Sequence, residues 1–277
     1  MVVGASRSGT TLLDLMMGHR SAGFSCGEVA YVFRPRRSVQ RQWRCRCGRD
    51  PCPVWKRFVT SDASRFHRSV VDGLQADLIA DSSKSLSWLI DVHGWNRRAG
   101  LRTANVVIWK DPIDLAYSYW SRTSSPTAWR AAFVSYYGRF LELELPYTSV
   151  RYSDLVNDPA RTIRGLCEAL EVRYEPGQER YWEGEDHHHA FGSNAPFQNL
   201  GSKTPGIWTR EPEPEFLDQW VNLAPVLSAD EEVQHILRAL AANDGSSCPF
   251  ADGVTLRRPA WYFKDRGIGL FRRLIPT

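Results

Sequence analysis

The residues of this chain that could do chemistry begin almost at its first position, in the loop Gly4-Ala5-Ser6-Arg7-Ser8-Gly9-Thr10-Thr11. The β-branched pair Val2-Val3 leads into the loop, and an apolar run with helical spacing begins at Leu12. Glycine lets the backbone approach a ligand closely, and the unpaired N–H groups at a helix start attract anions. Strand, tight turn and helix start together predict a phosphate or sulfate site. Its candidate residues are Arg7, Ser8, Gly9, Thr10 and Thr11.

An ATP-binding P-loop reads G-x-x-x-x-G-K-[ST], with a lysine after the second glycine. Gly4 and Gly9 have that spacing, but Thr10 stands at the lysine position and Arg7 is the only cation of the loop. The sequence therefore disfavours a nucleoside triphosphatase. On these residues alone, a strand-to-helix turn without a ligand is the alternative.

Two further cationic groups follow apolar stretches that we expect to be buried strands, at residues 78–80 and 106–109. The first stretch ends in Asp81-Ser82-Ser83-Lys84, and the second ends in Lys110. In open α/β sheets ligands bind at the carboxyl ends of the strands, so both groups should face the pocket of the first loop. Ser82 or Ser83 could equally cap the helix that follows.

A second anion site is predicted on the helix that follows Lys110. Pro112 suits the first turn of a helix, and Ser118 and Arg122 lie four positions apart, so they share one of its faces. Lys110 adds a second cation at the end of the strand, and the three side chains can converge on one anion. A surface helix with scattered polar residues is the alternative interpretation.

A candidate general base is Glu28, in the stretch Gly23-Phe24-Ser25-Cys26-Gly27-Glu28-Val29. This stretch comes soon after the first loop and the helix expected over residues 9–19, so the chain can return Glu28 to the mouth of the loop. A carboxylate beside a bound sulfuryl donor can take a proton from an acceptor hydroxyl. A solvated turn residue is the ordinary alternative for a glutamate after a glycine.

In this order the motifs resemble those of sulfotransferases that use 3′-phosphoadenosine 5′-phosphosulfate (PAPS). The run Arg7-Ser8-Gly9-Thr10-Thr11-Leu12 resembles their 5′-phosphosulfate loop, and Cys26-Gly27-Glu28 resembles the catalytic-glutamate segment of protein-tyrosine and heparan sulfotransferases. The D-S-S-K turn at 81–84 resembles that of bacterial sulfotransferases. The segment from Lys110 through Ser118 to Arg122 resembles the 3′-phosphate-binding segment, with lysine where arginine is usual.

The resemblance implies an α/β protein with a three-layer P-loop-like fold, in which helices flank a central parallel sheet. It implies sulfuryl transfer from PAPS to a hydroxyl or amine of a small-molecule, sugar or glycolipid acceptor, with no metal required. Glu28 would be the base, and Lys84 and Arg7 would stabilise the charge that develops on the departing nucleotide. A P-loop small-molecule kinase and a catalytically inactive nucleotide-binding relative are the alternatives. The residues that would bind the nucleotide are Arg7, Ser8, Gly9, Thr10, Thr11, Lys110, Ser118, Arg122 and Lys203, the last in a Gly- and Pro-rich candidate lid at 201–214.

Length and composition favour one domain over residues 1–277. The hydrophobic fraction of 43% suffices for a sizeable core, and the net charge of +4 fits a polyanionic ligand without requiring nucleic acid. No apolar run approaches the roughly 18 residues of a membrane span, and Met1 leads straight into the first strand. We therefore expect a cytoplasmic protein without an export signal.

Two groups of residues raise the question of a metal. Cys45, Cys47 and Cys52 lie in an irregular, basic insertion at about residues 34–60, where Trp43 and Trp55 are expected to anchor the loop. The thiols could bind zinc with His67 or another residue as fourth ligand, form a disulfide, or stay free, and buried or paired thiols are the preferred interpretation. For Asp186-His187-His188-His189 we prefer a solvated loop, because adjacent histidines point in different directions.

The remaining segments are predicted to support the site. The stretch His189-Ala190-Phe191-Gly192-Ser193-Asn194 resembles the sulfotransferase segment that closes over the nucleotide. The basic and aromatic tail at about 257–277 should dock on the domain, with covering the acceptor or touching an anionic membrane as alternatives. Further helices are expected at 62–76, 127–143, 159–170 and 216–242, and a further strand at 147–150.

Overall fold

Five short parallel strands form the centre of the described part of the molecule. The computed structural model describes residues 1–35, 43–59, 62–184, 187–198, 200–201, 211–243, 249–251, 254, 256 and 258–266. Its strands are β1 (Val2–Val3), β2 (Gly23–Ser25), β3 (Leu78–Ala80), β4 (Val106–Trp109) and β5 (Thr148–Arg151).

The strands pair in the orders β1-β4-β5 and β2-β3. Val2 lies opposite Val106, and Val106 lies opposite Thr148, all in parallel. The Val2 N–H donates to the Asp81 carbonyl at 2.8 Å, which joins β1 to the end of β3. The neighbours of β1 are therefore β3 on one side and β4 on the other. The chain thus builds the sheet outward from β1 in both directions. A ligand site is expected outside the carboxyl ends of strands at such a point.

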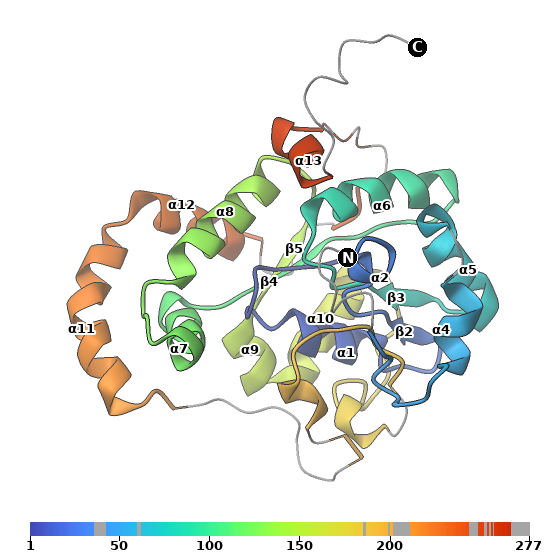
Figure 1. The fold of residues 1–277 in the computed structure, drawn as a ribbon, viewed down its shortest axis with the longest axis horizontal. Helices are drawn as coiled ribbons and strands as arrows, with labels where there is room; N and C mark the ends of the chain where they lie inside the picture. The colour runs from blue at the N-terminus through green and yellow to red at the C-terminus, as the bar shows by residue number, and fades with distance from the viewer. Residues whose placement is uncertain are drawn as a thin grey trace.

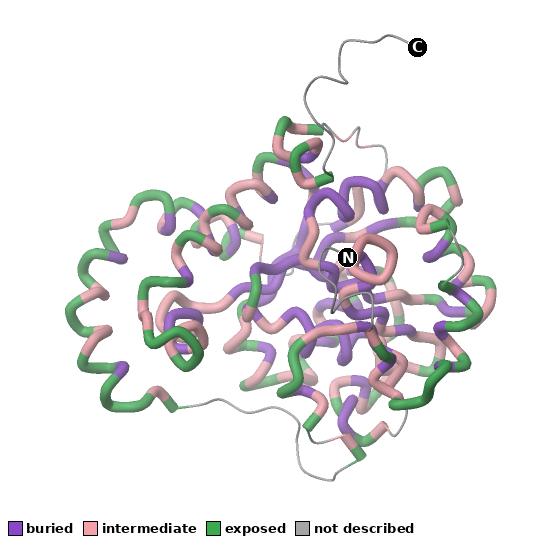
Figure 2. Tube along the Cα trace, viewed as in Figure 1, coloured by how far each residue is buried: buried purple, intermediate pink, exposed green. Residues whose placement is uncertain are grey.

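The alternation of side chains along β4 explains the three layers. Every residue of this strand is buried, because successive side chains point to opposite faces and both faces are covered. Val107 packs with the cluster of α6 (Leu86–Arg98) and α8 (Trp129–Leu141). Val106 and Ile108 pack with the cluster of α1 (Thr10–Gly18) and α10 (Pro159–Ala169). Figure 1 shows these helix pairs on the two sides of the sheet, and Figure 2 shows the buried residues concentrated between them. The predicted α/β fold with a central parallel sheet flanked by helices is confirmed.

The other helices complete the two outer layers. The helices expected at 9–19, 62–76, 127–143 and 159–170 are all present, with ends shifted by a few residues. Among its described residues, the insertion predicted as irregular contains one short helix, α4 (Pro53–Phe58). The remaining elements are α2 (Ala30–Phe33), α4 (Pro53–Phe58), η1 (Ala63–Arg65), α5 (Phe66–Leu74), α7 (Pro112–Thr123), α9 (Tyr152–Asn157), η2 (Tyr181–Glu183), η3 (Ala195–Phe197), α11 (Pro214–Ser228), α12 (Glu231–Ala241) and α13 (Ala260–Asp265).

The cap of α6 differs from the prediction. Neither Ser82 nor Ser83 caps this helix: the Ser85 hydroxyl accepts the Trp88 N–H at 3.4 Å. Ser83 instead accepts the Ala30 N–H at 2.9 Å and so caps a different segment. The prediction was wrong because the serines at positions 82, 83 and 85 are equivalent by residue type, while Ser85 directly precedes the helix and has the extended backbone of an N-cap (φ −114°, ψ 107°).

The insertion has an aromatic core of its own. Trp55 stacks on Phe66 of α5 with ring centroids 5.6 Å apart, and Trp43 meets the same indole edge-on at 5.2 Å. The two tryptophans therefore anchor this segment, as the sequence predicted.

The described part of the C-terminal segment, residues 258–266, docks on the domain as predicted. The buried Tyr262 of α13 donates its hydroxyl to Asp91 of α6 at 2.6 Å. Trp261 donates its indole N–H to Glu142 at 3.0 Å. Within the described ranges, no helix combines the length and the apolar character that crossing a membrane would need.

Candidate functional site

The loop between β1 and α1 has the backbone of an anion-binding turn. Arg7 and Gly9 have positive φ angles of 72° and 106°. A Cβ atom on Gly9 would lie 2.5 Å from the ring of Tyr152, so this position requires glycine. Both the N–H and the hydroxyl of Ser8 donate to the Ala5 carbonyl, at 3.2 and 2.8 Å. No side chain in the described ranges caps the start of α1, so the positive end of its dipole faces the loop.

Two tyrosines of α8 hydrogen-bond to the same loop. The Tyr136 hydroxyl accepts the Gly4 N–H at 3.3 Å, and the Tyr137 hydroxyl accepts the Ala5 N–H at 3.2 Å. Tyr137 also donates to the Ile108 carbonyl of β4 at 2.7 Å. Burial raises the pKa of both phenols, so they stay neutral. The sequence predicted a helix at 127–143, and its two adjacent tyrosines with polar tips were the signal that it also fixes the loop.

The first loop meets the helix of the second predicted anion site. Arg7 Nε donates to Ser118 Oγ of α7 at 2.8 Å. Lys110 Nζ lies 3.8 Å from the ring centroid of Tyr152, the ring that also packs on Gly9. Lys110 is half-buried, and this burial lowers its pKa to about 8, with Asp114 raising it and Arg7 lowering it further. Two cations and a hydroxyl predicted from separate motifs thus lie in one patch.

Two further residues, Arg122 and Lys203, were predicted to bind the nucleotide. Arg122 is exposed one turn along α7 from Ser118. Lys203 lies outside the described residues. The start of α7 is tied to β5, since Arg151 forms an ion pair with Asp111 at 2.6 Å.

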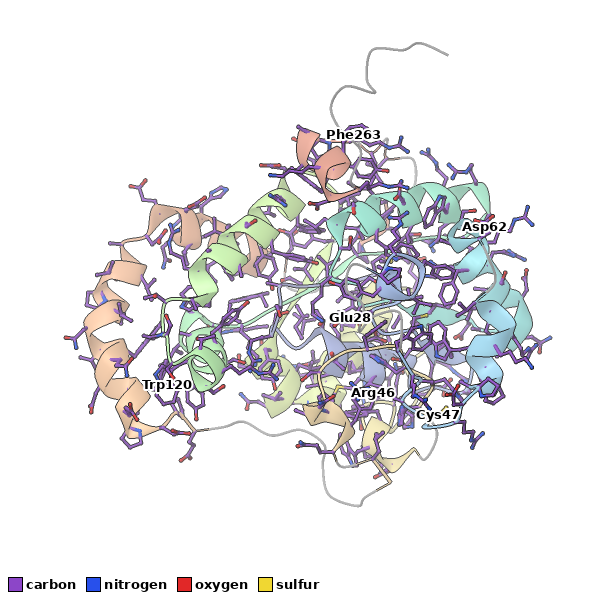
Figure 3. All side chains as sticks on the ribbon, viewed as in Figure 1. Glu28, Arg46, Cys47, Asp62, Trp120 and Phe263 are labelled. Carbon is purple, nitrogen blue, oxygen red and sulfur yellow. The ribbon has the colours of Figure 1, made fainter. Side chains whose placement is uncertain are left out.

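Glu28 and Lys84 form an ion pair. Lys84 Nζ donates to Glu28 Oε1, and the two side chains keep 17% and 13% of their surface exposed. Figure 3 shows Glu28 near the middle of the molecule. The Glu28 backbone N–H donates to the Ala190 carbonyl at 2.8 Å. The structure therefore brings together the two residues predicted as base and as cationic support, from turns that follow β2 and β3.

A buried carboxylate of α1 positions the Glu28 turn. Asp14 is fully buried, and it accepts the Ser25 hydroxyl at 2.5 Å and the Gly27 N–H at 3.1 Å. His189 Nε2 lies 3.7 Å from the same carboxylate. Sequence analysis missed Asp14, although an acidic residue inside the apolar run from Leu12 to Met17 was a signal that could have identified it.

A second buried carboxylate positions Lys84. Asp81 accepts the Ser83 N–H at 2.8 Å and the Trp88 indole N–H at 2.9 Å, and His67 Nε2 lies 3.2 Å away. Burial alone would raise the pKa of Asp81, but these hydrogen bonds and the nearby His67 lower it. The other ring nitrogen of His67 lies 3.3 Å from Asn96 Oδ1. The prediction that His67 is the fourth ligand of a metal bound by the three thiols is therefore wrong, because its ring lies between Asp81 and Asn96.

The segment that follows the histidine run lies over the loop. The Ser193 N–H donates to Thr11 Oγ1 at 3.0 Å, and Arg46 of the insertion donates to Asn194 Oδ1 at 2.8 Å. The prediction of a solvated loop is wrong for His189, which is fully buried. The reason is that the chain here pairs with Gly27 and so becomes part of the site wall.

The described part of the molecule has hollows both away from this region and near it. One of about 330 Å³ lies at the amino ends of the strands, lined by Met1, Leu78 and Ala104 among others, and none of the predicted site residues lines it. Another of about 350 Å³ has in its lining Ala30 and Ser85, which lie one or two positions after Glu28 and Lys84 in the chain. Its lining is Ala30, Tyr31, Arg34, Pro35, Ser85, Ser87, Asp265 and Arg266.

Comparison with known proteins finds similar solved structures, among them two sulfotransferase domains. No protein-family model and no curated protein matches the sequence. The sulfotransferase domain from the curacin biosynthetic pathway is 18% identical over 80% of this chain and 96% of its own, with a TM-score of 0.46. The sulfotransferase domain from the Synechococcus PCC 7002 olefin synthase is 16% identical over 87% and 93%, with a TM-score of 0.46. At this level of identity neither likeness speaks to the donor or the acceptor.

Proposed function

We propose that this chain is a sulfotransferase that moves a sulfuryl group from PAPS to an acceptor hydroxyl or amine. The observation that carries the proposal is the 2.8 Å hydrogen bond between Arg7 Nε and Ser118 Oγ. It supports one continuous site for the two anionic ends of a single nucleotide, since each end was assigned to a different motif. A nucleotide with phosphate groups on both its 5′ and 3′ positions suits two adjacent cationic groups.

The first loop would hold the 5′-phosphosulfate. The first-turn N–H groups of α1 and the helix dipole favour an anion at this point, and Arg7 adds a charge. The Thr11 hydroxyl accepts the Ser193 N–H and keeps its own hydrogen to donate. Ser8 shapes the turn through Ala5, while Lys110 and Ser118 would bind the 3′-phosphate.

The reacting groups would meet at the Glu28–Lys84 pair. The acceptor oxygen or nitrogen attacks sulfur, a new bond to sulfur forms, and the bond from sulfur to the nucleotide's bridging oxygen breaks. Glu28 takes the acceptor proton, a role typically worth about 10²–10⁴-fold in rate. Lys84 would offset the negative charge that the bridging oxygen gains. The ion pair holds the carboxylate in place before the acceptor arrives.

The acceptor would enter through the hollow of about 350 Å³ whose lining includes Ala30 and Ser85, near Glu28 and Lys84 in the chain. A volume of this size suits a small molecule or a terminal sugar. Tyr31, Arg34 and Ser85 would supply its polar contacts, and Arg266 of the C-terminal segment would form part of its wall.

Calorimetry with 3′,5′-adenosine bisphosphate, compared with ATP and Mg²⁺, tests the donor site. We expect the bisphosphate to bind and Arg7→Ala or Ser118→Ala to weaken it about tenfold or more, as expected for a charged hydrogen bond. Arg68→Ala, which removes an exposed cation paired with Asp72 on α5, is the matched control. Preferential binding of ATP with Mg²⁺ would instead indicate a kinase.

Transfer is tested separately with radiolabelled PAPS and a panel of phenols, sugars and amines. Labelled product that disappears in Glu28→Gln, with bisphosphate binding retained, supports the proposal. Bisphosphate binding without transfer to any acceptor would identify an inactive relative.

A further inference from the structure

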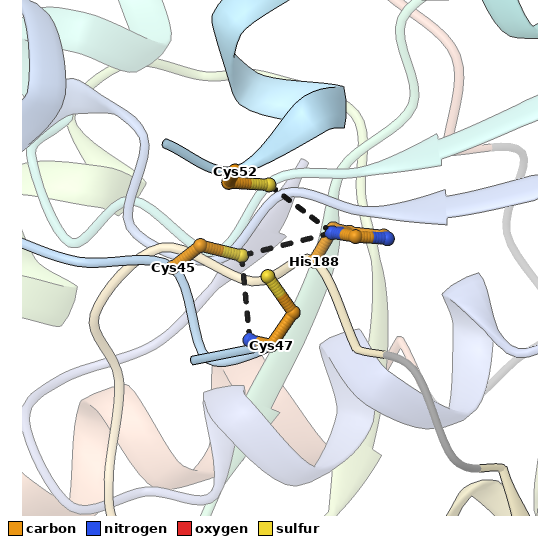
Figure 4. A group of neighbouring side chains, drawn as sticks. All are labelled: Cys45, Cys47, Cys52 and His188. Atoms are coloured by element: carbon orange, nitrogen blue, oxygen red, sulfur yellow. Dashed lines mark hydrogen bonds between the residues drawn. The ribbon is translucent and has the colours of Figure 1, made fainter. Parts of the chain in front are cut away.

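Four side chains that could bind a metal lie close together, three from the insertion and one from the segment at 187–198. The thiols of Cys45, Cys47 and Cys52 and a ring nitrogen of His188 all lie within 4.8 Å of one another. His188 Nδ1 lies 3.2 Å from Cys52 Sγ and 3.8 Å from Cys45 Sγ. Figure 4 shows the three sulfurs and the imidazole facing one another, with His188 arriving from a different part of the chain.

These spacings match a tetrahedral zinc site. With Zn–S bonds of about 2.3 Å and a Zn–N bond of about 2.0–2.1 Å, ligand atoms lie about 3.8 Å apart for two sulfurs and about 3.6 Å apart for sulfur and nitrogen. The observed distances of 3.2 and 3.8 Å lie on either side of the second value. Movements below about 1 Å would therefore bring all four atoms into the bonding geometry.

The backbone positions these ligands independently of any ion. The Trp55 indole donates to the His188 carbonyl at 3.2 Å, and the Arg46 N–H donates to the His189 carbonyl at 3.2 Å. The Cys47 N–H points at Cys45 Sγ and the Trp55 N–H points at Cys52 Sγ, each at 3.5 Å. Hydrogen bonds from N–H groups to sulfur stabilise thiolates, the form of cysteine that binds metals.

We propose that Cys45, Cys47, Cys52 and His188 bind one Zn²⁺ in a closed structural site. Four protein ligands leave no open position for water, which is typical of structural rather than catalytic zinc. A disulfide would use two of the thiols and leave the third sulfur and the imidazole unexplained, and all three cysteines are unpaired here. Three thiolates on Zn²⁺ carry one net negative charge, and arginines at positions 44, 46 and 49 are their neighbours in the sequence.

The ion would join two segments that both touch the proposed donor site. The insertion carries the three cysteines, while His188 begins the segment in which Ala190 accepts the Glu28 N–H and Ser193 donates to Thr11. Zinc would therefore hold this segment over the loop without taking part in the transfer. The site itself rests on the four ligands and does not depend on the proposed function.

Metal content and cobalt spectroscopy of the full chain test the site. After removal of any histidine tag and reconstitution with Zn²⁺ under reducing conditions, we expect about one zinc ion per chain by plasma mass spectrometry. Replacement by Co²⁺ should give the visible bands of a tetrahedral site and the near-ultraviolet bands of thiolate ligation. Cys47→Ser and His188→Ala should weaken cobalt binding at least about tenfold. Cys167→Ser, which alters another buried thiol near Gln178, is the matched control and should bind normally.

Alkylation mapping of the wild type gives an answer even if a variant fails to fold. Cys45, Cys47 and Cys52 should resist alkylation with zinc bound and react together once a chelator removes it. A chain that takes up no zinc or cobalt after reconstitution overturns the proposal. So does a disulfide among these cysteines under reducing conditions, or cobalt bands unchanged in both ligand variants.

Discussion

Replacing Lys110 with arginine should remove a pH dependence of nucleotide binding that the wild type shows above neutral pH. Burial lowers the pKa of Lys110 to about 8, against the opposing effect of Asp114 and with a further lowering by Arg7. A doubly charged 3′-phosphate binds the protonated amine, so its affinity should follow the fraction of Lys110 that carries a proton. Arginine keeps its charge throughout this range, because its pKa is above 12.

The size of the effect follows from this pKa. With a pKa of about 8, roughly nine-tenths of the lysine is protonated at pH 7 and roughly one-tenth at pH 9. Wild-type affinity for 3′,5′-adenosine bisphosphate should therefore fall about tenfold between these values, or about 1.4 kcal/mol. The effect of pH on the stability of the free protein has the opposite sign. Between about pH 8 and 10.5 Lys110 binds more protons in the unfolded state than in the folded state. Its contribution to the free energy of unfolding therefore rises with pH.

Isothermal titration calorimetry at pH 7, 8 and 9 measures this dependence, in buffers of matched ionic strength because phosphate binding is sensitive to salt. Lys110→Arg should bind with nearly the same affinity at all three values. Lys84→Arg, which changes a lysine outside the 3′-phosphate group, should keep the wild-type slope. A wild-type affinity that is flat across this range, or an undiminished slope in Lys110→Arg, would refute the assignment of Lys110 to the phosphate.

Three further predictions concern the residues around the loop. Glu28→Gln should lower single-turnover transfer by about 10²–10⁴-fold while leaving the bisphosphate dissociation constant within about twofold, and an unchanged rate would exclude Glu28 as the base. Asp14→Ala should lower the free energy of unfolding, measured in urea titrations, by about 2–5 kcal/mol, because it leaves the Gly27 N–H and the Ser25 hydroxyl without their acceptor. The control Asp72→Ala, at an exposed carboxylate, should lower it by less than about 1 kcal/mol. Tyr137→Phe should lower the free energy of unfolding by about 1–3 kcal/mol and weaken bisphosphate binding, because the Ala5 N–H loses its acceptor, and an unaltered affinity would show that the loop keeps its shape without Tyr137.

The sequence by itself determined the local parts of this protein. Val106 to Trp109 reads as a buried strand because every residue is apolar, and the Gly4–Thr11 stretch reads as an anion loop because glycine and a helix start act within a few residues. The order of these elements then placed Lys84 and Lys110 at the carboxyl edge of one parallel sheet. Such rules are local, so the sequence was sufficient for the fold class and for most helices.

Only the tertiary structure decided which distant residues meet. Arg7 with Ser118, Glu28 with Lys84, and Asp14 with Gly27 are contacts between separate elements, and no periodicity encodes them. His67 and His188 were equally acceptable fourth ligands by residue type, yet packing directs one ring between Asp81 and Asn96 and the other to the thiols. The physical reason is that a side chain's partners depend on the path of the whole backbone, which is the outcome of packing all the elements together.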